Sequence, residues 1–201
     1  MKKRTSILLS ALAVLLILLF LFSKTFIVNV FSGRVHFPEE RIGRNLAMED
    51  GKKFVVFRRL HISGTTGKAD DYTVFKVRFQ FKSFGPSINK RLSMIPAPFL
   101  IGMKGFREKY WTIDETSGFF QGIYQWESKA LAEKYISSFI FMLMTSRSAE
   151  GTLSYEILPG RDLSKYIEER SSTSTSAHGL MRYHATAVVC PGVGPREILD
   201  R

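Results

Sequence analysis

Aromatic residues gather in the middle of the chain, where alternation at period two and then helical spacing would place them on one side of two strands and a helix. Aromatic walls with a few hydroxyl and indole donors suit a flat aromatic or lipid-like ligand. The predicted pocket residues are Trp111, Tyr124, Trp126 and Tyr135. Phe99 and Met103, from a proline-rich segment, are predicted to form its lid. The alternative is that these side chains are simply core, because aromatics on the buried face of strands are what any small sheet needs.

Other recognisable chemistry is absent from the sequence. It contains no Walker loop, GxGxxG, GxSxG or HExxH pattern. His178, His184 and Cys190 recur every six residues, but this spacing matches no closed zinc motif. Cys190 is the single cysteine, so no internal disulfide forms. We therefore predict neither a metal site nor a bound cofactor.

The positive charge of the chain indicates lipid rather than nucleic acid as its partner. The net charge is +11, and removing the three N-terminal basic residues leaves 26 basic and 18 acidic residues, or +8. This surplus is spread along the chain without an RNP-type motif, zinc-finger spacing or a basic helix. Attraction to anionic lipid head groups explains it more simply.

Residues 5–23, TSILLSALAVLLILLFLFS, are 19 residues without a charge. A helix of about 20 apolar residues spans a hydrocarbon core of roughly 30 Å. The segment lacks the small-x-small site at which a signal peptide would be cleaved. We therefore predict an uncleaved, single-pass membrane anchor. Basic residues are nearly balanced across it, and their count leans to a domain on the extracytoplasmic side.

The remaining pattern predicts one α+β domain. Residues 53–62, 72–81, 105–126 and 152–158 read as a strand, a strand, a hairpin and a last strand. A short helix over 87–95, ended by Pro96 and Pro98, and a helix opened by Ser128 fall between them. The order is the ferredoxin-like βαββαβ arrangement with an extra N-terminal strand and a preceding transmembrane helix.

These patterns also set the expected boundaries. We predict a membrane anchor over 1–23, a juxtamembrane connector over 24–52, the α+β domain over 53–170 and a flexible tail over 171–201. One sheet face should pack on the helices. The other would carry mostly polar side chains, together with Tyr110 and Ile123, and would be either solvated or paired with a two-fold copy. The polar set is Lys76, Arg78, Gln80, Lys82, Gln121, Gln125, Ser154 and Glu156.

Several short stretches resemble a known family. Tyr110-Trp111-Thr112, Gly122-Ile123-Tyr124 and the helix start Ser128-Lys129-Ala130 resemble the hairpin and helix of mono-oxygenase-like proteins, the antibiotic-biosynthesis mono-oxygenase-like group of the dimeric α+β barrel superfamily. Gly105-Phe106 belongs to the same match, which covers about residues 72–160. The resemblance implies a homodimer and a pocket between sheet and helices. It also implies, for some members, oxidation of aromatic substrates by O₂ without metal or flavin.

Cofactor-free oxygenation would need a base that deprotonates a phenol or enol, so that the substrate anion can reduce O₂. His61 and Asp114 are the nearest candidates. However, Asp114 adjoins a turn that it is expected to cap, and His61 ends a strand outside the matching stretch. The catalytic residue therefore stays unassigned. Haem-degrading relatives bind iron through a helix histidine, which neither predicted helix contains, so haem oxygenation is disfavoured.

Two functions remain open at this point. One is a membrane-anchored mono-oxygenase-like protein that oxidises a small aromatic or apolar molecule without a cofactor. The other is a non-catalytic ligand-binding or scaffolding module tethered to the membrane. A cavity between sheet and helices that holds a polar group would favour the enzyme, and a filled core would favour the module.

Overall fold

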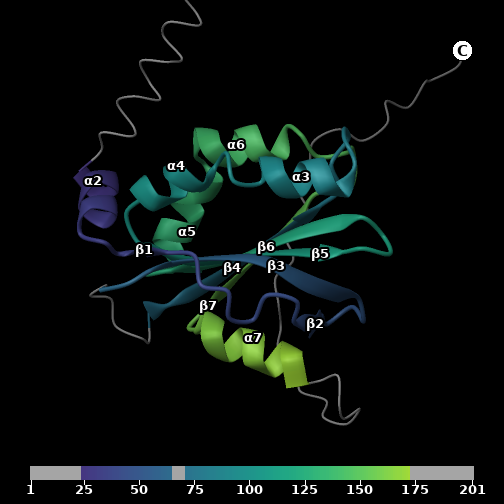
Figure 1. The fold of residues 1–201 in the computed structure, drawn as a ribbon, viewed down its shortest axis with the longest axis horizontal. Helices are drawn as coiled ribbons and strands as arrows, with labels where there is room; N and C mark the ends of the chain where they lie inside the picture. Colours follow the sequence, from purple (N-terminus) through teal and green to yellow (C-terminus); the bar gives the residue numbers. More distant parts are fainter. Residues whose placement is uncertain (1–23, 65–70, 173–201) are drawn as a thin grey trace, which may run out of the picture.

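An antiparallel sheet forms the centre of the computed structural model, which describes residues 24–64 and 71–172 (Figure 1). Its strands run in the order β1-β3-β5-β6-β4-β7, and β2 also pairs with β3. The elements are α2 (Lys24–Phe31), β1 (Val35–His36), β2 (Asn45–Ala47), β3 (Lys53–Ile62), β4 (Thr73–Phe79), α3 (Pro86–Leu92), α4 (Ala97–Gly102), β5 (Phe106–Asp114), β6 (Phe119–Trp126), α5 (Lys129–Ile136), α6 (Phe139–Thr145), β7 (Ser154–Pro159) and α7 (Leu163–Ser172).

The ferredoxin-like α+β fold is confirmed. β4, α3 with α4, β5, β6, α5 with α6, and β7 follow one another as βαββαβ, and every strand pair among them is antiparallel. The additional strand β3 pairs with β5 at the edge of this unit. The alternating sequence of β4 accounts for its place beside β6 and β7, since its Phe75, Val77 and Phe79 all pack in the core below the helices.

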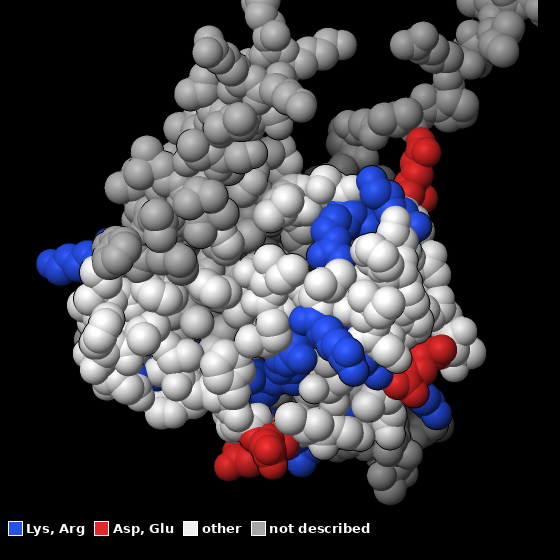
Figure 2. Space-filling model, turned by 45° about the horizontal axis from the view of Figure 1, so that its top comes forward, with Lys and Arg blue, Asp and Glu red and all other residues white. Residues whose placement is uncertain are grey.

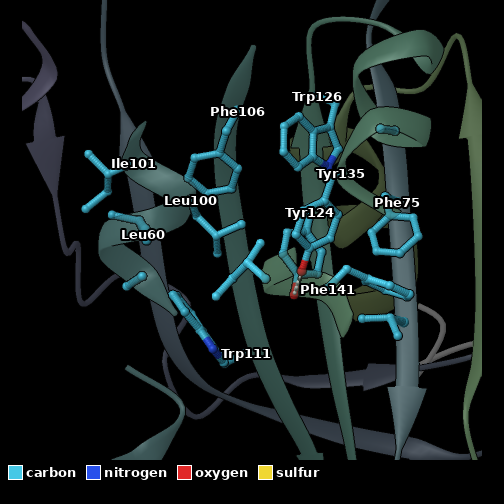
Figure 3. Packing of buried hydrophobic residues seen from close by; sticks show 14 of the residues in the cluster. Leu60, Phe75, Leu100, Ile101, Phe106, Trp111, Tyr124, Trp126, Tyr135 and Phe141 are labelled. Atoms are coloured by element: carbon cyan, nitrogen blue, oxygen red, sulfur yellow. Dashed lines mark hydrogen bonds between the residues drawn. The ribbon is translucent and has the colours of Figure 1, made fainter. Parts of the chain in front are cut away.

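The helical layer covers one face of the sheet, where α3, α4, α5 and α6 lie together (Figure 1). Beneath it is the larger core cluster, which includes Phe75, Trp126 and Tyr135 (Figure 3). The start of α5 is as predicted, because Ser128 Oγ accepts a hydrogen bond from the Leu131 amide.

Two expectations about this layer were wrong. The helix from Ser128 is two helices. α5 ends at Ser137, its C-cap, and Ser138 begins α6, because its Oγ accepts a hydrogen bond from the Phe141 amide. The restart changes which side faces inward, so Phe139 and Met142 are exposed. The proline-rich segment was expected only to end the preceding helix, but it forms a helix of its own, α4. Its two prolines occupy the N-cap and first turn, where no backbone N–H is required.

The other sheet face is covered by the chain itself. Helix α7 lies on it (Figure 1), and Leu163, Tyr166 and Ile167 pack in a second core cluster with Tyr110 and Ile123. The side-chain oxygen of Gln125 accepts the backbone N–H at the start of α7. This part of the face is therefore neither solvated nor free to pair, which corrects that expectation. A dimer formed through it would require α7 to move away.

The segment predicted as a connector belongs to the folded unit. β1 and β2 both pair with β3, and α2 packs on α4, where Asn29 Nδ2 donates to the Ile101 carbonyl at 2.9 Å. At the other end α7 continues to Ser172, past the predicted boundary at residue 170.

The predicted anchor over 5–23, the tail from residue 173 onward and the His178, His184 and Cys190 series all lie outside the described residues. None of the helices within 24–64 and 71–172 combines the length and the apolar character needed to cross a bilayer.

Candidate functional site

A cavity of about 60 Å³, measured as the space open to the centre of a water-sized sphere, lies between the sheet and the helical layer. Its floor is made by β4, β5 and β6, and its walls are almost entirely apolar. The roof is formed by Leu92, Ile95, Pro96, Ile140, Leu143 and Met144. The space is several times what one water molecule needs, so the core is not filled here.

The Lys109 side chain lies at the floor of this cavity. Its residue is only 2% exposed, and Nζ lies 4.2 Å from the centre of the Trp111 ring and 4.5 Å from that of Tyr124. Among residues 24–64 and 71–172, no carboxylate or other hydrogen-bonding group partners this amine. A buried amine without a polar partner is costly, and such groups concentrate at functional sites.

A bulge in β5 directs Lys109 to this side. Phe106 pairs with Trp126 and Glu108 with Gln125, so Arg107 is an extra residue without a partner on β6. Phe106 faces the helices. Because of the extra residue, the next side chains of β5 on that side are those of Lys109 and Trp111. Without the bulge, Glu108 rather than Lys109 would point toward the cavity.

Burial is the main cause that lowers the pKa of Lys109 well below its ordinary value, because the charged form loses its hydration. The positive charge of Arg58 lowers this pKa further. The π faces of Trp111 and Tyr124 attract the ammonium form and offset part of the effect. The amine is therefore shifted toward the neutral state, in which it can accept a proton.

The charges around the cavity are all positive. Arg147 lines it and lies 4.9 Å from the centre of the Phe81 ring, while Arg58 lies near Trp111 and donates to Ser93 Oγ at 2.7 Å. No Asp or Glu occurs among the described residues that line the cavity. Such a site favours a ligand that becomes negatively charged.

Tyr124 lies across the backbone of Gly122 on the cavity floor. A Cβ at Gly122 would come within 2.7 Å of the Tyr124 ring. A glycine at this position is therefore needed for the ring to lie here. The Tyr124 and Tyr135 hydroxyls lie 3.3 Å apart (Figure 3). Burial raises the pKa of both phenols, so they remain protonated and serve as hydrogen-bond donors.

The six predicted pocket residues divide into three groups. Trp111 and Tyr124 line the cavity. Trp126 and Tyr135 stack on one another behind it, with ring centres 5.2 Å apart, and the Trp126 indole N–H has no hydrogen-bond partner in the described part of the chain. Phe99 and Met103 pack against the same core from α4 and its end, and they form no lid over this cavity.

Neither predicted base lies in the cavity. His61 is on the opposite sheet face, where its Nδ1 lies 3.5 Å from Glu108 Oε2. Asp114 caps the hairpin turn as expected, since its Oδ1 accepts the Thr116 amide at 3.0 Å. The base that the site does contain, Lys109, was missed. Its signal was present, because Lys109 is two residues before Trp111 and so shares its strand face.

The described residues include no cluster of three or more His, Cys, Asp or Glu side chains that could bind a metal ion. Within the part of the chain that the structure describes, one lysine and one arginine are the charged groups that line the cavity. Its chemistry therefore comes from an amine, a guanidinium and aromatic rings.

Comparison with solved structures finds monooxygenase-related proteins of the ferredoxin fold, the group that the sequence resembles. An uncharacterised protein related to antibiotic biosynthesis monooxygenases from Listeria monocytogenes is 14% identical, with 58% of this chain and 69% of that chain covered and a TM-score of 0.43. A monooxygenase-like protein from Listeria innocua is 16% identical, with 58% and 68% covered and a TM-score of 0.43.

A heme-degrading enzyme from Listeria monocytogenes is 10% identical, covers 69% of this chain and 95% of its own, and has a TM-score of 0.44. No protein-family model and no curated protein matches the sequence. These likenesses concern the fold, and the role of each residue rests on the geometry described above.

Proposed function

We propose that this protein is a mono-oxygenase-like enzyme that uses Lys109 to deprotonate a small aromatic phenol or enol, which O₂ then oxidises without a cofactor. The observation that carries the proposal is the buried, unpartnered Lys109 amine in an apolar cavity whose charges are all positive. General-base catalysis requires a neutral base within reach of the substrate, and burial lowers the pKa of Lys109, which favours the neutral form.

The reaction would proceed as follows for a substrate with an acidic CH₂ group. Lys109 Nζ removes one proton and becomes an ammonium, which pairs with the substrate anion. The anion transfers electrons to O₂ as a C–O bond forms, and the resulting peroxide takes the proton back from Lys109. Loss of water from this hydroperoxide leaves a ketone. The sum is CH₂ plus O₂ giving C=O plus H₂O.

The other residues of the cavity support this step. Aromatic walls stack on a flat substrate, and the absence of carboxylates among the described lining residues avoids repulsion of its anion. The Arg147 guanidinium adds positive charge where negative charge develops.

Substitution of the base tests the proposal. Anthrone, a tricyclic ketone with an acidic methylene, is a suitable probe, and O₂ uptake is the measurement. Lys109→Met is expected to lower the rate by about 10²–10⁴-fold, the usual contribution of a general base. Lys129→Met is the matched control, because Lys129 is exposed on α5, and its rate should stay that of the native protein.

Binding of 2-naphthol provides the complementary readout, because naphthol and naphtholate absorb at different wavelengths. The native protein should bind it partly as the anion, and Lys109→Met only as the neutral phenol. Binding without O₂ uptake by any phenol or enol would instead identify the non-catalytic ligand-binding module.

Membrane anchorage through residues 5–23 is the second part of the proposal. It is supported by the uncharged length of that segment and by the net positive charge of the rest of the chain. A homodimer also stays a prediction, and because α7 covers one sheet face, we propose that any dimer uses another surface.

A further inference from the structure

The cavity reaches the surface between α3 and α6, and large apolar side chains surround the opening. Ile95 and Leu143 line the cavity and are themselves exposed. We define the mouth surface as the exposed apolar residues of these elements and the adjoining loops. They are Phe84, Ile88, Ile95, Phe139, Met142 and Leu143. Phe84, Phe139 and Met142 are each at least 60% exposed, and large apolar side chains in solvent often mark an interaction site.

The loop before α3 is held so that Phe84 points outward. Phe84 has a left-handed backbone with φ of 65°, a conformation that is strained for an aromatic residue. The buried Asn89 side chain holds it there, because its Nδ2 donates to the Ser83 and Phe84 carbonyls at 3.0 and 2.9 Å. Strain that keeps an apolar side chain in solvent indicates a role for that side chain at the surface.

The stretches of sequence that carry the mouth surface contain only basic charges, although Glu115 from the hairpin turn pairs with Lys90 of α3 at 2.9 Å. No Asp or Glu occurs between Asp71 and Glu108, or between Glu133 and Glu150. The exposed charges within these stretches are Lys82, Arg91, Lys104 and Lys134. Figure 2 shows this side of the molecule as largely uncharged, with basic side chains in its middle and acidic ones toward its edges. An apolar patch with basic neighbours complements an anionic lipid surface.

The start of the described chain lies on the same side. Helix α2, which directly follows the predicted anchor, lies with α4, α6 and α3 on one side of the sheet (Figure 1). It also exposes Val28, Val30 and Phe31. The proposed anchor over residues 5–23 would therefore hold this side, rather than the side of α7, next to the bilayer.

We infer that the mouth surface rests in the headgroup region of a bilayer containing anionic lipid, and that the cavity receives its substrate from the membrane. The substrate class is then a lipid-soluble aromatic phenol or enol. The substrate part rests on the proposed function, whereas the membrane contact does not. Insertion of Phe84, Phe139 and Met142 removes apolar surface from water, and basic residues near the lipid surface are attracted to anionic head groups.

Lipid quenching of a fluorophore tests the contact on the full chain. The chain with Cys190→Ser carries either Met142→Cys on α6 or Lys165→Cys on α7, each labelled with a nitrobenzoxadiazole dye. Vesicles of phosphatidylcholine and phosphatidylglycerol contain lipid with a nitroxide on its acyl chain. The label at position 142 should lose several-fold more fluorescence than the label at 165, which is exposed on the opposite side of the sheet. Equal quenching at the two positions would overturn the inference.

Substrate delivery has its own test. The double variant Phe139→Glu and Met142→Glu changes two exposed residues that do not line the cavity. For anthrone dissolved in the vesicles, its KM should rise about tenfold with kcat unchanged, since apolar contact with lipid is lost. An unchanged KM would refute delivery from the membrane. Selective quenching at position 142 without Lys109-dependent O₂ uptake would support the membrane contact and reject the proposed function. Lys109-dependent O₂ uptake without selective quenching would reject the membrane contact alone.

Discussion

We expect Lys109 to reduce the stability of the fold, because its side chain is buried in the apolar cavity. An unsatisfied buried polar group costs about 1–3 kcal/mol, so Lys109→Met should raise the free energy of unfolding by about that amount at neutral pH. The same substitution is expected to remove O₂ uptake. Opposite effects on stability and activity would distinguish a catalytic lysine from a structural one. Urea unfolding of both proteins measures the difference.

The pH dependence of this difference has a definite sign. Burial lowers the pKa of Lys109 in the folded state, so between that pKa and the ordinary value of 10.5 the unfolded chain binds more protons. The destabilisation caused by Lys109 is therefore full below the folded pKa and decreases as pH rises through this window. The stability gain of Lys109→Met should be largest below the folded pKa and shrink in alkaline solution. A gain that is constant with pH would contradict the assignment of a depressed pKa.

Gly122 is the residue that shapes the cavity floor. Gly122→Ala would push the fully buried Tyr124 ring, and overpacking of this kind costs about 1–3 kcal/mol. It should also weaken 2-naphthol binding, because Tyr124 lines the cavity and contacts Lys109. Gly85→Ala is the control, since a Cβ there meets no atom within 4 Å. Equal effects of the two substitutions on unfolding and binding would show that the Tyr124 contact is unimportant.

At the scale of elements, α7 closes the sheet face that the cavity does not use. Ile167 is fully buried in the second core cluster, so Ile167→Ala should lower the free energy of unfolding by about 2–5 kcal/mol. Lys165→Ala, on the exposed side of α7, should change it by less than about 0.5 kcal/mol. Denaturant unfolding of the two variants measures the difference. If Ile167→Ala lowered the free energy of unfolding no more than Lys165→Ala does, α7 would not be packed on the sheet.

Polar contacts reinforce this closure. Lys76 lies 3.2 Å from Glu49 and 2.7 Å from Glu156, and the Tyr166 hydroxyl donates to Glu49 at 3.1 Å. The carboxylate of Glu49 thus joins the sheet, the segment after β2 and α7. Lys76, Glu156 and Arg78, three of the charged side chains predicted on this face, are paired within the chain. Lys82, the fourth, is exposed.

The whole molecule has two unlike sides. The side with α7 is closed by packing and ion pairs. The side with α2, α3 and α6 carries the cavity opening, apolar surface and basic charge. This asymmetry fits a domain whose helical layer meets a membrane, with a substrate that dissolves in lipid.

The local pattern of the sequence was sufficient for the βαββαβ order, the extra strand over 53–62 and the caps at Ser128 and Asp114, because strand alternation, turns and capping depend on neighbouring residues. The register of β5, the packing of α7 and the cavity around Lys109 were decided only by the tertiary structure. A single extra residue at Arg107 reverses which side chains face the helices, and its position depends on pairing with β6. Likewise, whether aromatic residues fill a space or leave one depends on how α3 and α6, which are separate from these strands along the chain, pack above them. No local pattern encodes that packing.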